Sequence, residues 1–372
     1  MVQAESQTFA HAIESKYPEQ TRTISVRVPA SYSASSESSY PALYLLDAQS
    51  NLNYTVAVVD FLAANGLMPE LIVVGLDAGA TRSRDYLPEN PELSAPISGD
   101  ADQFMAYVER ELIPFVESNY RMADYRILSG HSYGGVFVTH VMARQPELFQ
   151  AYLTQSPFLD DAIGPAVIER LRASLHSGWQ DDSPREAFYY LTWGNELNLE
   201  TQINTFATLA QNDSHDSITW EFQHAPQQTH MTTRLLGQYH ALAALFEQHW
   251  SLNPSTIAQG GASVVTAHLD MLSRRIGASV RWSDSQFQQA VQVAMSQQDL
   301  KSALQITERY IEHYPESPVA FLIQASLLGA GGNVEQALQA VNTGIDLYES
   351  NPRSELSEVY SQLRAMRNQL QG

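Results

Sequence analysis

Apolar residues in the first 250 positions follow two spacings, one typical of strands and one typical of helices. Residues 41–47 and 70–76 are continuous apolar runs, as expected of strands buried on both faces. Residues 21–29 alternate apolar and polar positions, which indicates a half-exposed strand near a sheet edge. Further strands are predicted at residues 151–154, 187–193 and 218–222, and one more leads into Gly130.

Helical spacing of apolar residues occurs between these runs. It predicts helices at residues 53–66, 101–120 and 232–250, and another that follows residue 132 and ends by Pro146. Alternating strands and helices favour right-handed crossovers and a mostly parallel sheet with helices on both faces. Ligands of such sheets bind at the C-terminal ends of the strands. We therefore expect any functional site in the segments that follow the strands.

Strand signals end near residue 250. We predict one α/β domain over residues 1–250, a polar linker at 251–263 and an all-α domain over 264–372. The segment from residue 301 resembles the segment from residue 335, so that Ala303 matches Ala337 at an offset of 34 residues. This is the period of a tetratricopeptide repeat. A short array must bury its open face, so we expect packing on the first domain or a homo-oligomer formed through these helices.

The amino-acid composition limits the kinds of molecule that the protein is expected to bind. Twenty-one basic and 41 acidic residues give a net charge of −20, which disfavours binding to nucleic acid and to anionic membrane surfaces. The chain has no cysteine, so disulfides and thiolate metal sites are excluded. No apolar run has the length of a membrane span, and the first residues lack the apolar core of a signal peptide. The compartment stays open: cytoplasmic, or periplasmic or secreted if a leader has been removed.

The most informative motif is Gly130-His131-Ser132-Tyr133-Gly134, which fits the G-x-S-x-G nucleophile elbow. A serine on a tight turn between strand and helix needs small residues two positions to either side, because larger side chains would collide there. A strand precedes the motif and a helix follows it, whereas a surface turn that contains serine by chance needs neither. We predict Ser132 to be a nucleophile.

A serine nucleophile needs a histidine as its general base and an acid that orients the histidine. After an elbow serine, the acid comes next along the chain and the histidine comes last, behind the final strand of the sheet. His230 lies at that position. Glu196 follows the strand at 187–193 and is our preferred acid. Asp213 and Asp216 are the alternatives, in a polar loop whose simpler interpretation is a solvated turn.

Acyl transfer also needs two N–H donors for the oxyanion. One is expected to be the amide of Tyr133, directly after the nucleophile. The other should follow the strand at 41–47, where the amide of Ala48 is our first choice and that of Gln49 the second.

Several motifs in order resemble a family of α/β-hydrolase esterases that includes esterase D and the enterochelin esterases. They cover about residues 21–250 and are Tyr44-Leu-Leu-Asp-Ala48, Val73-Val-Gly-Leu76, Arg82-Ser-Arg-Asp-Tyr-Leu-Pro88, Glu111-Leu-Ile-Pro114 and the segment 125–135. The resemblance implies an α/β-hydrolase fold and hydrolysis of carboxylic esters by serine, histidine and an acid, without a metal or cofactor. Bacterial members that carry a tetratricopeptide-like C-terminal region are also similar to this chain. Ala48 departs from the pattern, since many relatives have glycine there.

Together these observations predict a serine carboxylesterase that forms an acyl-enzyme on a small-molecule ester. The alternatives within enzymes are a specialised ester hydrolase, for siderophore, feruloyl or acyl-sugar esters, and an acyltransferase. The alternative from another class is a scaffold in which the repeats carry the function and the hydrolase domain is vestigial. Arg82 and Arg84 are expected to pair with Asp47 or Asp85, or else to hold the oxyanion loop or an acidic substrate.

Overall fold

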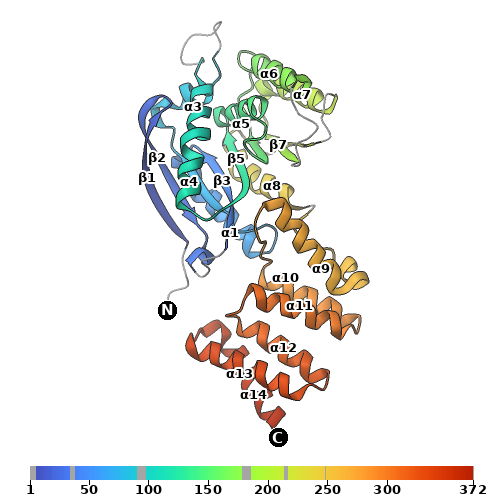
Figure 1. Cartoon of the computed structure of the whole chain (residues 1–372). Helices are drawn as coiled ribbons and strands as arrows, with labels where there is room; N and C mark the ends of the chain where they lie inside the picture. Colours follow the sequence, from blue (N-terminus) through green and yellow to red (C-terminus); the bar gives the residue numbers. More distant parts are fainter. Residues whose placement is uncertain are drawn as a thin grey trace. The chain divides into compact units, whose positions relative to one another are not determined.

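The computed structural model describes residues 6–33, 38–89, 98–177, 186–212, 217–247 and 249–371 (Figure 1). The chain forms two compact units. The first contains residues Met1–Gln248 and Arg274–Ser279, and the second contains His249–Ser273 and Val280–Gly372. Each unit is described by itself below.

The first unit is built on a sheet that has eight strands in the described part of the chain, in the order β1-β2-β4-β3-β5-β6-β7-β8. β1, β2 and β4 pair antiparallel, and every other neighbouring pair is parallel. The strands are β1 (Gln7–Lys16), β2 (Glu19–Val28), β3 (Tyr40–Leu46), β4 (Ile72–Leu76), β5 (Met122–His131), β6 (Ala151–Gln155), β7 (Ala187–Trp193) and β8 (Ile218–His224). β3, β4, β6 and β7 are buried along their whole length, as their continuous apolar sequences predict.

Helices cover both faces of this sheet (Figure 1). α1 and α8 contact each other and the strands on one face, while α2, α3, α5 and α6 form a contacting group that includes the helix after the elbow. The helices are α1 (Ala48–Ala64), α2 (Arg82–Tyr86), α3 (Ala101–Tyr107), α4 (Ile113–Asn119), α5 (Tyr133–Arg144), α6 (Gly164–Ser177), α7 (Leu197–Asn212) and α8 (Thr233–Glu247). A π-helical turn at Val108–Leu112 joins α3 to α4. The predicted α/β-hydrolase fold is confirmed.

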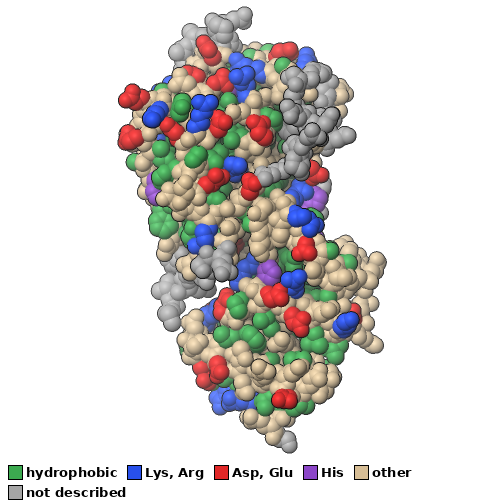
Figure 2. Space-filling model, viewed as in Figure 1, with side chains coloured by type: hydrophobic (Ala, Val, Ile, Leu, Met, Phe, Trp, Pro, Cys, Tyr) green, Lys and Arg blue, Asp and Glu red, His purple; other side chains and the backbone are tan. Residues whose placement is uncertain are grey.

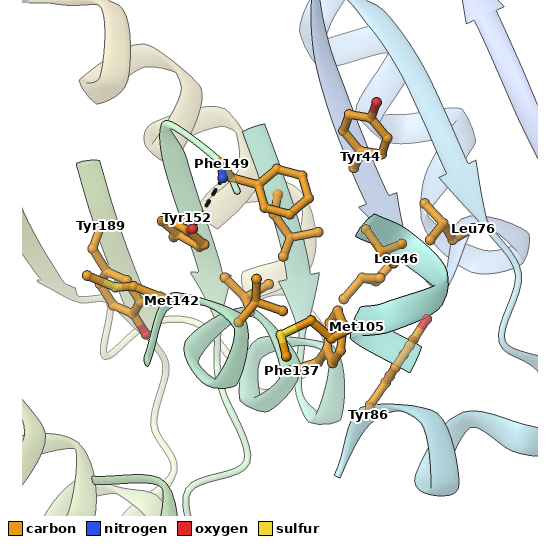
Figure 3. Packing of buried hydrophobic residues seen from close by; sticks show 14 of the residues in the cluster. Tyr44, Leu46, Leu76, Tyr86, Met105, Phe137, Met142, Phe149, Tyr152 and Tyr189 are labelled. Carbon is orange, nitrogen blue, oxygen red and sulfur yellow. Dashed lines mark hydrogen bonds between the residues drawn. The ribbon is translucent and has the colours of Figure 1, made fainter. Parts of the chain in front are cut away.

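Aromatic side chains fill the layer between the sheet and α5 (Figure 3). The Phe137 ring, on α5, lies 5.0 Å from the Phe104 ring and 5.8 Å from the Tyr86 ring, measured between centroids. Residues 134–143 of α5 are all buried. The helix behind the elbow is therefore held on every side by the core.

In the described part of the second unit, every element is a helix or a helical turn. It contains α9 (Pro254–Ile276, whose last residues belong to the first unit), α10 (Asp284–Ser296), α11 (Leu300–His313), α12 (Pro318–Ala330), α13 (Val334–Ser350), a short 3-10 turn (Ser354–Leu356) and α14 (Ser357–Gln371). The paired alanines Ala303 and Ala337 are fully buried, on α11 and α13. The predicted C-terminal helical region is confirmed, and its likeness to tetratricopeptide repeats stays a prediction.

The structure differs from the sequence interpretation at several elements. β1 was not predicted, because most of its residues are exposed and its pattern carries little apolar alternation. β1 forms the sheet edge, so β2 lies one strand inside it. α1 begins at Ala48 rather than at residue 53, since Asp47 adopts a left-handed conformation (φ 54°) that turns the chain directly from β3 into the helix. The buried Asn51 follows the turn and donates to the Leu46 carbonyl at 3.0 Å.

Two helices were not predicted from the sequence. Residues 156–184 include α6, and α7 fills most of the segment between β7 and β8. The predicted linker at 251–263 is helical from Pro254, with a break at Gly261 (φ 59°, ψ −143°). Its Ser, Gly and Gln residues gave a loop-like composition, but Ile257 and Ala262 are buried and anchor the helix.

Acidic side chains lie scattered among basic ones on the face shown in Figure 2. Among the described residues, no helix is both long enough and apolar enough to cross a membrane.

The aromatic layer supplies the first testable expectation. Phe137→Ala removes a fully buried ring that packs against Tyr86 and Phe104, and should lower the free energy of unfolding by about 3–5 kcal/mol. Phe61→Ala is the matched control, because the Phe61 side chain is 54% exposed. Urea denaturation of both variants checks this. Equal losses in the two would show that the layer behind α5 contributes no special stability.

Candidate active site

Ser132 lies at the turn between β5 and α5, where the sequence predicted an elbow. Its φ of 60° and ψ of −119° place it in a conformation that non-glycine residues rarely adopt. A Cβ on Gly130 would lie 2.5 Å from the carbonyl carbon of Gly134, so the chain can cross itself only with a glycine here. The Ser132 amide donates to the Gln155 carbonyl at 3.0 Å, which fixes the turn on the end of β6.

Glu196 and His230 are brought together at the ends of β7 and β8. The Glu196 Oε1 atom accepts a hydrogen bond from Nδ1 of His230. The Glu196 side chain is only 6% exposed, whereas that of His230 is 33% exposed and reachable from solvent. The alternative acids Asp213 and Asp216 lie outside the described residues.

Gly194 explains how the two loops come so close. A Cβ on Gly194 would lie 2.4 Å from the Gln228 carbonyl oxygen, on the chain that leads to His230. The amide of the next residue, Asn195, donates to that same carbonyl at 2.8 Å. The glycine thus lets the segment with the acid pair directly with the segment that carries the histidine.

His131 connects His230 to the elbow. Its Nε2 atom donates to the backbone carbonyl of His230 at 2.6 Å, and the two rings lie 4.5 Å apart between centroids. His230 is therefore held beside the residue that precedes Ser132. Among the described residues, no hydrogen bond joins the Ser132 hydroxyl to the His230 ring; such contacts are often long before substrate binds.

Electrostatics favour an ionised Glu196. Burial raises the pKa of this carboxyl, but hydrogen bonds from His230, Ser156 and the Gly194 amide outweigh burial and lower the pKa below its usual value. A carboxylate can accept the Nδ1 proton of His230 and stabilise an imidazolium ring. Glu196 is therefore ionised at neutral pH and can serve as the acceptor for the His230 ring.

The pKa of His131 is lowered to about 3, chiefly by burial and then by the charge of His230. His131 is consequently neutral at ordinary pH. Because its Nε2 faces a carbonyl oxygen, the proton of the neutral ring resides on Nε2. His131 therefore adds no positive charge beside His230.

Tyr133 and Ala48 occupy equivalent places, each as the first residue of a helix that begins at the C-terminal end of a strand. The first N–H groups of a helix have no partner within it and lie at its positive end. Ala48 is packed close to β4, where a Cβ on Gly75 would lie 2.6 Å from the Ala48 Cβ. Burial raises the pKa of the Asp77 carboxyl, and the nearby Gln49 amide partly opposes this rise.

Arg82 joins the two segments that carry these amides. Its Nε bonds both carboxylate oxygens of Asp47, at 2.9 and 3.0 Å, and another guanidinium nitrogen donates to the His131 carbonyl at 3.1 Å. The guanidinium also lies over the rings of Tyr86 and Tyr133. Arg82 therefore holds the β3–α1 turn against the elbow. Arg84 pairs with Asp85 at 2.8 Å, so both predicted pairings occur.

The sequence analysis missed Ser156, which follows β6 and bonds Glu196 at 2.6 Å. Its only sequence signal is its place at the C-terminal end of a strand. An open cleft of about 500 Å³ lies beside this pair, lined by Phe158, Asn195, Glu196, Leu197, Asn198, Leu199 and His230. Among the described residues, no group of three or more His, Asp or Glu side chains could hold a metal ion.

An elbow serine, two helix N-termini and an acid–histidine pair at the C-terminal ends of the parallel strands are typical of the α/β-hydrolase class of proteins. Within this class, residues 15–240 match the family model described as "Putative esterase". The chain therefore belongs to that esterase family.

Curated relatives of the chain include siderophore esterases. The ferri-bacillibactin esterase of Bacillus subtilis is 33% identical over 137 residues, which cover 32% of this chain and 47% of that protein. The siderophore triacetylfusarinine C esterase of Aspergillus fumigatus is 34% identical over 79 residues, or 20% of this chain and 26% of that protein. The chain thus spans about half the length, or less, of these relatives.

Solved structures share the fold. An IroE-like serine hydrolase from Shewanella oneidensis has a TM-score of 0.69 at 22% identity, covering 83% of this chain and 100% of that one. An uncharacterised protein from Capnocytophaga ochracea has a TM-score of 0.69 at 18% identity and covers 98% of this chain and 99% of that one. The second likeness extends over the C-terminal helices as well as the hydrolase unit.

Because His131 is buried, the free energy of unfolding should depend on pH in the acid range. In the unfolded chain it would bind a proton near pH 6.5, but in the folded protein only near pH 3, so acid favours unfolding between these values. The free energy of unfolding should fall between pH 6.5 and 3 more steeply in the wild type than in His131→Gln, by about 1.4 kcal/mol per pH unit. Urea denaturation across this range measures the difference, with His240→Gln, at an exposed position, as control. Parallel curves for wild type and His131→Gln would contradict the assignment.

Proposed function

We propose that the protein is a serine carboxylesterase in which Ser132, His230 and Glu196 act together. The observation that carries this proposal is the hydrogen bond between Glu196 and His230 Nδ1, located beside an elbow that presents Ser132. The fold alone supports many chemistries, whereas this pair has one common use beside a serine, namely its activation as a nucleophile.

In the proposed reaction, the Ser132 hydroxyl attacks the acyl carbon of the ester and His230 Nε2 takes its proton. Glu196 accepts the Nδ1 proton in a hydrogen bond, which fixes the tautomer with a free Nε2 and stabilises the charged ring. His230 then donates its proton to the leaving alcohol. Water enters, His230 takes a proton from it, and the acyl-enzyme is cleaved to release the acid and regenerate Ser132.

The negative charge that develops on the acyl oxygen would be bound by the amides of Tyr133 and Ala48. Each is the first amide of a helix, so both the hydrogen bond and the helix dipole favour an oxyanion there. Arg82 would keep the two amides at a fixed separation through its bonds to Asp47 and His131. Its positive charge also lowers the cost of an anion nearby.

A specialised ester is the second candidate, because curated relatives of the chain are siderophore esterases. A panel of p-nitrophenyl esters, siderophore esters and feruloyl esters separates general from specialised hydrolysis. Turnover of simple esters at rates comparable to the others would favour the general carboxylesterase. Addition of alcohol acceptors to the same assay tests acyl transfer, which would give a new ester instead of free acid.

Ser132→Ala should abolish turnover while leaving the fold intact, because it removes the nucleophile at a half-buried turn. Loss of a triad nucleophile costs about 10⁶-fold in kcat in a well-studied protease. Labelling with a fluorophosphonate probe should mark the wild type on Ser132 and fail to mark the variant. An unlabelled, inactive wild type would favour a scaffold role instead. Near-normal turnover by the folded variant would end the nucleophile assignment.

Glu196→Gln tests the acid directly. The amide keeps the size of the side chain but cannot stabilise a charged His230, and it can favour the wrong tautomer, so kcat should fall by about 10⁴-fold. Circular dichroism should show an unchanged fold. Asp213→Asn and Asp216→Asn are the comparison variants and should each retain near-full activity. A large loss in one of them with a mild effect of Glu196→Gln would transfer the role to that aspartate.

A further inference from the structure

We infer that Ser156 is a positioning residue for Glu196, which holds the carboxylate so that its other oxygen faces His230. The inference rests on the proposed function. Ser156 is fully buried and follows the last residue of β6. It would touch neither substrate nor the reacting serine, and acts only through Glu196.

The contacts of Glu196 divide between its two oxygens. Oε1 faces His230, while Oε2 accepts from the Ser156 hydroxyl at 2.6 Å and from the Gly194 amide at 3.0 Å. The Gly194 amide belongs to the same loop as the acid and moves with it. Ser156, by contrast, donates from a separate segment, directly after β6. Its own amide donates to the Thr192 carbonyl at 2.7 Å, so the hydroxyl is fixed to the sheet.

The number of available hydroxyl protons indicates which group donates in the contact between Ser156 and Glu196. The Ser156 oxygen also lies 2.8 Å from the Thr233 hydroxyl, which in turn lies 2.8 Å from the His230 carbonyl. Two hydroxyl protons thus serve three contacts. Because hydrogen bonds to an ionised acceptor are stronger, the Ser156 proton is directed to the carboxylate.

Thr233 donates to the His230 carbonyl at 2.8 Å, and the second lone pair of that carbonyl accepts from His131 Nε2 at 2.6 Å. Glu196, Ser156, Thr233 and the His230 carbonyl therefore form one chain of polar contacts. Thr233 is the first residue of α8, three positions after the histidine. The chain links the helix behind His230 to the acid that orients it.

The backbone of Ser156 gives independent support. Its φ of 42° lies in the left-handed region, where glycine is favoured and a side chain adds strain. Backbone strain of this kind persists where the surrounding structure and a role require it. A serine at a position that suits glycine indicates that the hydroxyl is needed.

Two substitutions separate the hydroxyl from the backbone. Ser156→Ala removes the hydroxyl and keeps a side chain at the positive φ, whereas Ser156→Gly removes the hydroxyl and relieves the strain. Thr154→Ala is the matched control, since it deletes another buried hydroxyl two residues earlier, on β6, which donates to the Tyr190 carbonyl on β7 at 2.9 Å. Both Ser156 variants should lose about 10- to 100-fold in kcat with KM little changed, and the control should lose much less.

Two readouts distinguish positioning from simple destabilisation. Loss of the hydroxyl removes a donor that lowers the pKa of Glu196 and so changes the carboxylate that His230 faces. The acid limb of the kcat/KM profile, which reports the coupled pair, should therefore move in both Ser156 variants. The downfield proton NMR signal of His230 Nδ1, which reports its bond to Glu196, should shift or broaden in both Ser156 variants. It should stay in place in Thr154→Ala.

Full activity, an unmoved acid limb and an unchanged Nδ1 signal in Ser156→Gly would overturn the inference, and would mean that residue 156 serves the backbone alone. The NMR signal needs no substrate. If the wild type hydrolyses no ester, the proposed function fails, while the signal still decides whether Ser156 holds Glu196.

Discussion

The close crossing of the chain at Gly130 and Gly134 is the constraint on which the site depends. With a Cβ on the first glycine 2.5 Å from the backbone of the second, the turn cannot form with any other residue at that position. The crossing sets the strained backbone of Ser132, the start of α5 and the placement of the Tyr133 amide. The energy of that strain is offset by α5, which is buried over ten consecutive residues.

Around this turn, four loops are joined by polar contacts rather than by apolar packing. Arg82 joins the β3–α1 turn to the elbow, His131 joins the elbow to the histidine loop, and Gly194 lets that loop pair with the acid. Each contact uses a backbone carbonyl or a charged pair. Such contacts are directional, so they set angles and tautomers where apolar contacts would set only distance.

Much of this arrangement could be predicted from sequence because it depends on local spacing. The elbow, the buried strands and the elements that carry Ser132, Glu196 and His230 each leave a pattern within about ten residues. Ser156 and Thr233 leave no such pattern. Their contacts join segments that are distant in the sequence, and a positive φ cannot be recognised from a serine in the sequence. β1 was missed for a related reason, since an edge strand with exposed faces lacks the alternation that marks a strand. The helix at 254–276 shows that composition alone cannot separate a linker from a helix whose few buried residues are anchored by contacts.

The burial of α5 has a consequence for how substrate preference can change. No residue from 134 to 143 faces solvent, so this stretch of α5 offers no position that can vary without disturbing the core. The cleft beside His230 is lined instead by Phe158 and by residues 195–199 at the start of α7, where Leu197 is 79% exposed. The residues that hold the elbow and the residues that line the cleft are thus largely separate sets. New specificities can accumulate in the second set at little cost in folding stability, which makes the cleft the natural target for directed evolution of this scaffold.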